Sequence, residues 1–139
     1  MDTAGEEMFR SLNACYYRKA DCCLLVYDIT NRQSFEEIKN YFNQNIKEQC
    51  KKNIKIILLG NKTDLEDNRE VPPEEGAQFA LENDYVFMET SCLKNTNVAN
   101  AFETLIELTR REIKRNYVKE EKLIISKKNK FNKKRRNFC

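Results

Sequence analysis

Three short apolar runs divide the chain, and each is followed by polar residues. They cover residues 22–27, 54–59 and 85–88, and the first ends at Asp28. Runs this short, rich in β-branched and aromatic residues, predict strands that are buried on both faces of a sheet.

The segment between the first two runs predicts an amphipathic helix. Its apolar residues recur three or four positions apart, at Phe35, Ile38, Phe42 and Ile46. Ser34 and Glu37 have the spacing of a capping box, in which the hydroxyl accepts hydrogen bonds from backbone N–H groups at the helix start. We therefore expect this helix to begin at Ser34.

Two further helices are expected. Pro72-Pro73 can open one of them, since proline is tolerated in a first turn. A long last helix has a predicted inner stripe made of Val98, Phe102, Leu105, Thr109 and Ile113. Strands that alternate with helices predict an α/β fold with a doubly wound sheet, here of three parallel strands with crossover helices.

Charge is distributed unevenly along the 139 residues. Residues 119–139 contain nine Lys and Arg against two Glu, a net charge of +7, whereas residues 1–118 carry a net charge of −4. Seven basic residues fall within 127–136, where the helical pattern fades, and such a composition is typical of disorder. We predict a folded domain over 1–118 and a basic, disordered interaction tail over 119–139.

Cysteine usage makes a zinc site improbable. The chain has six cysteines, no histidine and no CxxC pair. We expect reduced thiols in the cytoplasm. The apolar runs are far shorter than the ~20 residues that cross a bilayer, so any membrane contact is expected through charge or a lipid.

The polar clusters at the predicted strand ends hold the candidate chemistry, because ligands of doubly wound sheets bind beyond the carboxyl ends of the strands. Asn-Lys-Thr-Asp (61–64) follows the second run, Glu-Thr-Ser (89–91) follows the third, and Asp-Thr-Ala-Gly (2–5) opens the chain. In this order and spacing the three motifs resemble the Ras superfamily of small GTPases, over about residues 2–115. The segments similar to Rab-type sequences are residues 7–12, 16–21 and 25–30.

The resemblance implies a guanine-nucleotide site. Asp64 is expected to accept hydrogen bonds from the N1–H and 2-amino groups of guanine, a donor pair that adenine lacks. Asn61 is expected to bond the guanine edge and to tie loops together, and the Lys62 stem to lie over the base. Ser91 is expected to brace Asp64. The alternative for residues 61–64 taken alone is an ordinary polar turn.

Cys92 and Leu93 depart from the family pattern, which usually has Ala-Lys at these two positions. Cys92 is expected to act through its backbone N–H, which would reach the guanine oxygen. Leu93 can still cover the base, but it adds no charge.

The first motif implies contacts to phosphate and metal. Asp2 is expected to hold magnesium through water, and the Gly5 N–H to face the γ-phosphate, where glycine allows a close backbone approach. Glu6 stands where the family has the glutamine that positions the attacking water, so we expect slow hydrolysis. The alternative for residues 2–5 is a disordered N-terminus.

No GxxxxGK[ST] pattern occurs in the chain, so the phosphate-binding loop of the family is missing. We expect the C-terminal part of a Rab-like switch in vesicle-mediated transport, which binds GTP and GDP with magnesium and hydrolyses GTP, although this chain alone is expected to be inactive. The alternative is a truncated, non-hydrolysing interaction protein.

The expected partners follow from the resemblance and from the tail. Residues 6–17 correspond to the switch segment that meets effector and exchange proteins. The basic tail is expected to bind anionic membranes, with a lipid on Cys139, which places the protein peripherally on intracellular membranes. We set aside a nucleic-acid arm, because no folded reading module accompanies the tail.

Overall fold

Three parallel strands form the centre of the fold in the computed structural model, which describes residues 17–136. They are β1 (Cys22–Asp28), β2 (Lys55–Asn61) and β3 (Val86–Thr90), and they lie in the order β1-β2-β3. Both pairs are parallel. The prediction of an α/β fold with three parallel strands is therefore confirmed.

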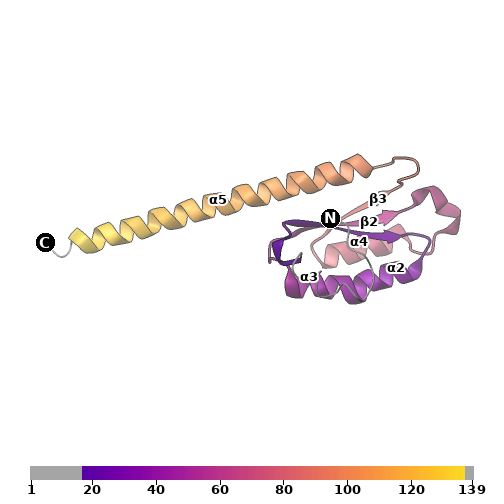
Figure 1. Ribbon diagram of the computed structural model, residues 1–139, viewed down its shortest axis with the longest axis horizontal. Coiled ribbons are helices and arrows are strands. Elements are labelled where there is room, and N and C mark those ends of the chain that lie inside the picture. Colours follow the sequence, from indigo (N-terminus) through magenta and orange to yellow (C-terminus); the bar gives the residue numbers. More distant parts are fainter. Residues whose placement is uncertain (1–16, 137–139) are drawn as a thin grey trace.

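One face of the sheet is covered by the helices that connect the strands (Figure 1). α2 (Arg32–Glu37), the wider-turned η2 (Ile38–Phe42) and α3 (Asn43–Gln49) follow one another without a break, and α4 (Pro73–Glu82) lies beside them. The core on this face joins strand and helix side chains: Leu25, Tyr27, Ile56, Leu58, Phe35, Ile38, Ile46 and Ala80. The predicted apolar stripe of the first helix is thus the one that is buried.

The start of α2 differs from the prediction. Asn31 caps the helix, and its side chain accepts a hydrogen bond from Ser34 N at 3.3 Å. The Ser34 hydroxyl instead accepts from Asp28 N at 3.1 Å and donates to Asn31 O at 2.7 Å. The predicted start at Ser34 is wrong because asparagine is as good a cap as serine and stands three positions earlier.

The opposite face is covered by the first part of α5 (Val98–Arg136). Ala101 and Leu105 pack there against Ile57 and Leu59 of β2. The predicted inner stripe is only partly correct, because Leu105 is buried while Phe102 and Ile113 are exposed, at 55% and 54%. The helix is rotated from the expected orientation.

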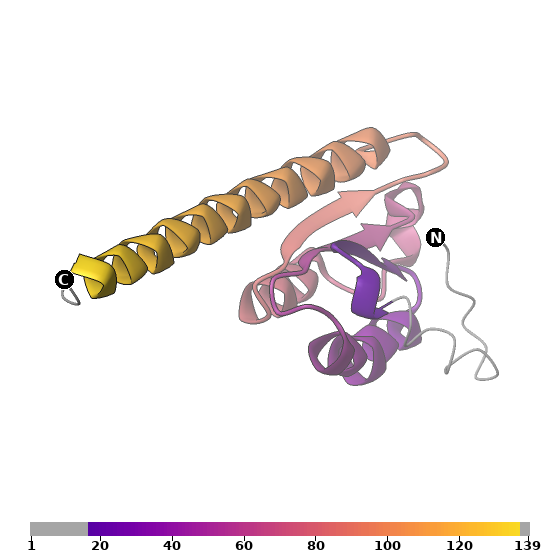
Figure 2. The ribbon, with the colours of Figure 1, turned by 60° about the vertical axis from the view of Figure 1, so that its left-hand side comes forward.

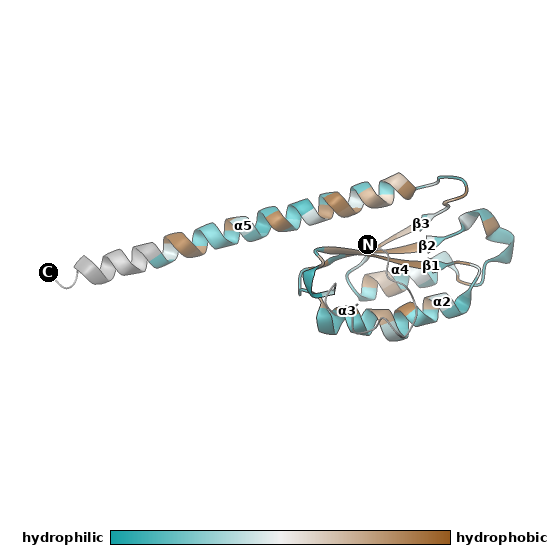
Figure 3. Cartoon of the chain, viewed as in Figure 1, coloured by the Kyte–Doolittle hydropathy of each residue, from teal (hydrophilic) through white to brown (hydrophobic). Residues whose placement is uncertain are grey.

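β2 is buried on both faces, as predicted, but β1 is not. The Val26 side chain on β1 is 53% exposed, whereas Leu25 and Tyr27 on the other face of the strand are buried. β1 lies at the edge of the described sheet, and no described strand pairs with its outer side. Figure 3 shows all three strands coloured as hydrophobic, and on β1 part of this hydrophobic surface is exposed, at Val26.

The C-terminal part of α5 also differs from the prediction. The structure has helix as far as Arg136, where the sequence predicted a disordered tail from residue 119. Figure 2 shows the helix continuing well past the sheet, and every described side chain from Tyr117 to Lys127 is exposed. The packed part of α5 supplies a helix nucleus, so later residues need only propagate it. The division of the chain at residue 118 stays a prediction.

The length of α5 does not make it a membrane span. Within residues 17–136, no helix has a stretch apolar and uncharged enough to cross a bilayer.

Candidate functional site

The carboxyl ends of the three strands lie level at one edge of the sheet. Asp28 of β1 is in register with Asn61 of β2, and Asn61 with Thr90 of β3. The short helix η3 (Thr63–Asn68) follows β2, and the loop 91–97 follows β3. Both leave the sheet at the same end (Figure 1). The fold therefore brings together the two motifs that the sequence singled out.

Asn61 joins the two loops through one atom of its side chain. Its Oδ1 accepts hydrogen bonds from the Thr90 hydroxyl at 3.2 Å and from the Cys92 thiol at 3.5 Å. Its Nδ2 has no partner among the described residues. The tie between loops that we predicted for Asn61 is present, and its amide N–H groups are left to donate to a ligand.

Asp64 is held by Ser91, as predicted. The Ser91 side chain is fully buried, and its hydroxyl donates a short hydrogen bond to Asp64 Oδ1 while accepting one from Lys94 N at 3.0 Å. A second link between the loops runs from the Thr63 hydroxyl to Thr90 O at 3.2 Å. Asp64 accepts no other hydrogen bond within residues 17–136, so Oδ2 is left to accept from a ligand.

Lys62 has a left-handed backbone and is paired with a carboxylate. Its φ is 73°, and its Nζ lies 2.6 Å from Asp28 Oδ2. The Thr30 N–H and hydroxyl donate to Asp28 Oδ1 at 2.9 and 2.7 Å. Burial alone would raise the pKa of Asp28, but the hydrogen bonds from Lys62 and Thr30 lower it. The hydrogen bond to Asp28 raises the pKa of Lys62, so both groups are charged at neutral pH.

The loop after β3 is exposed from Cys92 to Asn97, and two of its residues are candidates for the site. Cys92 is an exposed free thiol, and Leu93 is 82% exposed. Hydrogen bonds between the backbones of Ser91 and Thr96, at 3.1 and 2.9 Å, close the loop at its base. Leu93 is therefore free to cover a planar ligand, and the role expected of it stays a prediction.

A further ion-pair cluster joins the same two segments. The Arg69 guanidinium bonds Glu66 of η3 and Glu89 of β3, with shortest distances of 2.6 and 2.7 Å. Hydrogen bonds to Glu66 and to Glu89 raise the pKa of Arg69. The sequence analysis missed Arg69 and Asp28. Asp28 could have been found from its place directly after the first apolar run, whereas no pattern marks Arg69.

The remaining predicted residues lie outside the described part of the chain. They are Asp2, Gly5, Glu6, Cys139 and all of the segment 6–17 except Tyr17. Tyr17 is partly buried and packs against the core cluster that contains Leu25 and Tyr27. Within residues 17–136, no three Cys, Asp or Glu side chains are grouped to hold a metal ion.

Comparison with known proteins decides the family. The model of the Ras family matches residues 1–111. The chain belongs to the Ras family. This Ras-family chain is 48% identical over 105 residues to the Ras-related protein RABA4b of Arabidopsis thaliana. The aligned residues make up 76% of the chain and 46% of that protein. It is 48% identical over 104 residues to the Ras-related protein Rab-8A of Bos taurus, over 75% of the chain and 50% of the relative.

A third relative matches a larger share of the Ras-family chain. The Ras-related protein RGP1 of Oryza sativa subsp. japonica is 45% identical over 123 residues, which are 88% of the chain and 54% of that protein. The chain spans about half the length of the curated relatives it matches. These relatives identify it as a Rab-like member of the Ras superfamily of small GTPases.

Proposed function

We propose that this chain supplies the base-recognition part of a guanine-nucleotide site in a Rab-like small GTPase. The observation that carries the proposal is the pair formed by Asp64 and Ser91, which comes from two loops at neighbouring strand ends. Asp64 is half-buried with one carboxylate oxygen held and the other without a partner among the described residues. A carboxylate that is held through one oxygen suits a ligand with two adjacent N–H donors.

The chemistry of the bases makes this arrangement selective. Guanine offers N1–H and the 2-amino group side by side, and each carboxylate oxygen has lone pairs to accept them. Adenine has no such donor pair, so it would leave Oδ2 of the half-buried Asp64 without a partner. The Asn61 amide supplies a donor for the acceptor side of the same base. Lys62, Cys92 and Leu93 are proposed to line the base as the family resemblance implies.

The whole switch is proposed on the family resemblance. Asp2 is assigned to magnesium, Gly5 to the γ-phosphate and Glu6 to the side of the attacking water during GTP hydrolysis. Residues 6–17 are proposed to meet effector and exchange proteins. The proposed cellular role is that of a molecular switch in vesicle-mediated transport on cytoplasmic membrane surfaces.

Membrane attachment is proposed for the basic C-terminal segment. The side chains of residues 117–127 are exposed, so this part of α5 is accessible to a surface, and residues 119–139 carry a net charge of +7. Each basic residue near an anionic leaflet contributes about 1 kcal/mol. A lipid on Cys139 is proposed to add to this attraction.

A binding experiment on the 139-residue chain tests the proposed base recognition. A few hydrogen bonds of about 0.5–1.5 kcal/mol each give millimolar affinity at best, so amide chemical-shift mapping suits the measurement. GDP is expected to shift the amides of residues 61–65 and 91–94, and ADP is expected to leave them unchanged.

Two matched variants sharpen the test. Asp64→Asn should move the preference from GDP to XDP, because an amide N–H complements the 2-oxo group of xanthine. Asp67→Asn removes an exposed carboxylate from the same helix η3 and should leave the preference for GDP as it was. Equal shifts with GDP and ADP, or an unchanged GDP preference in Asp64→Asn, would contradict the proposal.

A further inference from the structure

Arg69 makes five hydrogen bonds from a guanidinium whose side chain is only 12% exposed. Nε and Nη2 donate to the two carboxylate oxygens of Glu66 at 2.7 and 2.6 Å. Nη1 and Nη2 donate to Glu89 at 2.7 and 3.2 Å, and Nη1 also donates to Val71 O at 3.0 Å. One side chain thus joins two carboxylate side chains and one backbone carbonyl from three places along the chain.

The partners of Arg69 lie beside the residues proposed to read the base. Glu66 stands two positions after Asp64, within η3, and Glu89 stands two positions before Ser91, near the end of β3. Arg69 therefore forms a further bridge between the two segments that the Ser91–Asp64 and Thr63–Thr90 hydrogen bonds join.

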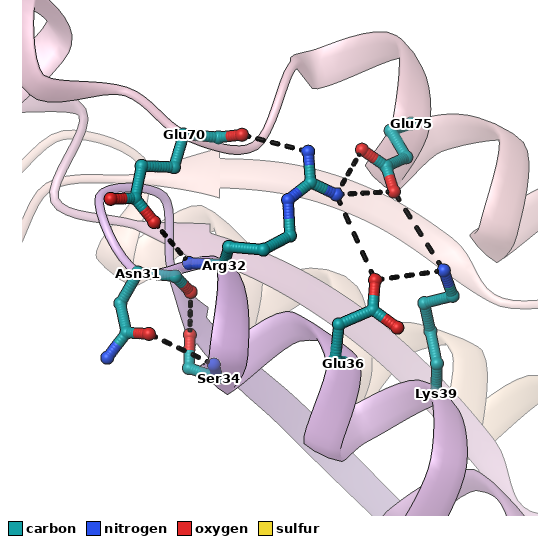
Figure 4. A network of polar contacts seen from close by, with 7 residues as sticks. All are labelled: Asn31, Arg32, Ser34, Glu36, Lys39, Glu70 and Glu75. Carbon is teal, nitrogen blue, oxygen red and sulfur yellow. Dashed lines mark hydrogen bonds and ion pairs between the residues drawn. The ribbon is translucent and has the colours of Figure 1, made fainter.

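The far end of the loop is fixed without Arg69. The N–H groups of Glu70 and Val71 donate to Ile29 O at 2.8 and 3.0 Å. Arg32 holds the same stretch, with its Nη2 bonding Glu70 O at 2.9 Å and its Nη1 pairing with Glu75 (Figure 4). Loss of Arg69 would therefore untie the C-terminal part of η3 from β3, while its first residues keep their hydrogen bonds to Thr90 and Ser91 and the chain after it stays attached to β1 and α2.

We propose that Arg69 is a positioning residue for guanine recognition. It holds η3 against the end of β3, so that the Asp64 carboxylate stays within hydrogen-bond distance of the Ser91 hydroxyl. The inference rests on the proposed function of Asp64. Without the guanidinium, the negative charges of the Glu66 and Glu89 carboxylates would lose their shared cation, and the two carboxylates would repel each other. Lysine keeps the charge but lacks the planar fork that reaches both carboxylates and a carbonyl.

The ratio of GDP to IDP affinity reports the position of Asp64. Inosine lacks only the 2-amino group, so the ratio isolates one hydrogen bond to the carboxylate. A hydrogen bond to a charged group corresponds to a preference of about tenfold. In the 139-residue chain, Arg69→Lys should reduce that preference towards parity, measured by ligand-observed NMR titration. Glu89→Gln should reduce it in the same direction and serves if Arg69→Lys does not fold.

Arg32→Lys is the matched control, because it also weakens a multiply bonded arginine near the loop but leaves η3 tied to β3. It should lower the urea midpoint of unfolding and keep the GDP preference. A preference retained in both Arg69→Lys and Glu89→Gln, or lost equally in Arg32→Lys, would overturn the inference. Absence of any GDP preference in the unaltered chain would instead overturn the proposed function.

Discussion

The hydroxyl of Tyr27 is buried without a hydrogen-bond partner within the described structure. Tyr27 is 2% exposed and lies between β2 and α4, where two glycines leave room for its ring. Burial raises the pKa of this phenol, with a smaller contribution from Glu89. We predict that Tyr27→Phe stabilises the chain, because it removes a polar group that folding takes out of water without replacing its hydrogen bonds.

The size of the effect follows from two opposing terms. An unsatisfied buried polar group costs about 1–3 kcal/mol. Removing the oxygen leaves a void of about 15 Å³, which at about 24 cal/mol per Å³ costs about 0.4 kcal/mol. The net gain is therefore about 0.6–2.6 kcal/mol. With a urea slope of about 1.5 kcal/mol/M for a chain of this size, the midpoint should rise by about 0.4–1.7 M.

Urea unfolding followed by circular dichroism measures this change, and Tyr85→Phe is its control. The Tyr85 hydroxyl donates to Asn43 Oδ1 at 2.5 Å, so removing it should destabilise the chain by about 1 kcal/mol. The two Tyr→Phe changes are thus expected to have opposite signs. A fall in the midpoint for Tyr27→Phe, at an unchanged slope, would show that this hydroxyl is satisfied and that the reasoning is wrong.

Three other predictions test the packing and the site. Gly76→Ala should destabilise the chain, measured by urea unfolding, because its Cβ would lie 2.6 Å from Tyr27 Oη and 2.7 Å from Phe87; combining it with Tyr27→Phe should recover part of the loss. Burial raises the pKa of the Cys23 thiol from 9.0 to about 11, so the thiol ionises at lower pH in the unfolded chain than in the folded one. The free energy of unfolding should therefore fall between about pH 9 and 11, by up to about 1.4 kcal/mol per pH unit, and Cys23→Val should make this fall less steep. GDP should protect the exposed Cys92 thiol from iodoacetamide, seen by peptide mass spectrometry, and equal labelling with GDP and ADP would count against the site.

The three strands could be predicted from the sequence, because short apolar runs bounded by polar residues and alternating with helical patterns indicate the buried strands of an α/β fold. The orientation of α5 could not. Its sequence has two apolar arcs, and periodicity alone does not say which faces the sheet. The arc with Ala101 and Leu105 is packed, while Phe102 and Ile113 lie on the exposed one. Glu112 is buried beside this core because Lys55 pairs with it at 3.2 Å.

The candidate site was predictable where several residues act as a motif. Asn61 ends β2, Asp64 follows it three positions later and Ser91 comes directly after β3, so the parallel sheet brings them together. The bridges made by Arg69 and Asp28 were not predictable in the same way. Asp28 stands out only as the polar residue that ends the first apolar run, and Arg69 is one charged residue among others, so the partner of each is known only once the loops are placed in space.

The unbroken course of α5 gives the C-terminal segment the mechanics of a rod. From Asn116 to Arg136 the helix rises 1.5 Å per residue, which makes an arm of about 30 Å beyond the packed body. A flexible chain of the same length would let the body tumble freely around whatever holds its end. A helical arm transmits orientation as well as distance. Any partner that grips its tip therefore also fixes the direction in which the strand ends carrying Asp64 and Ser91 face.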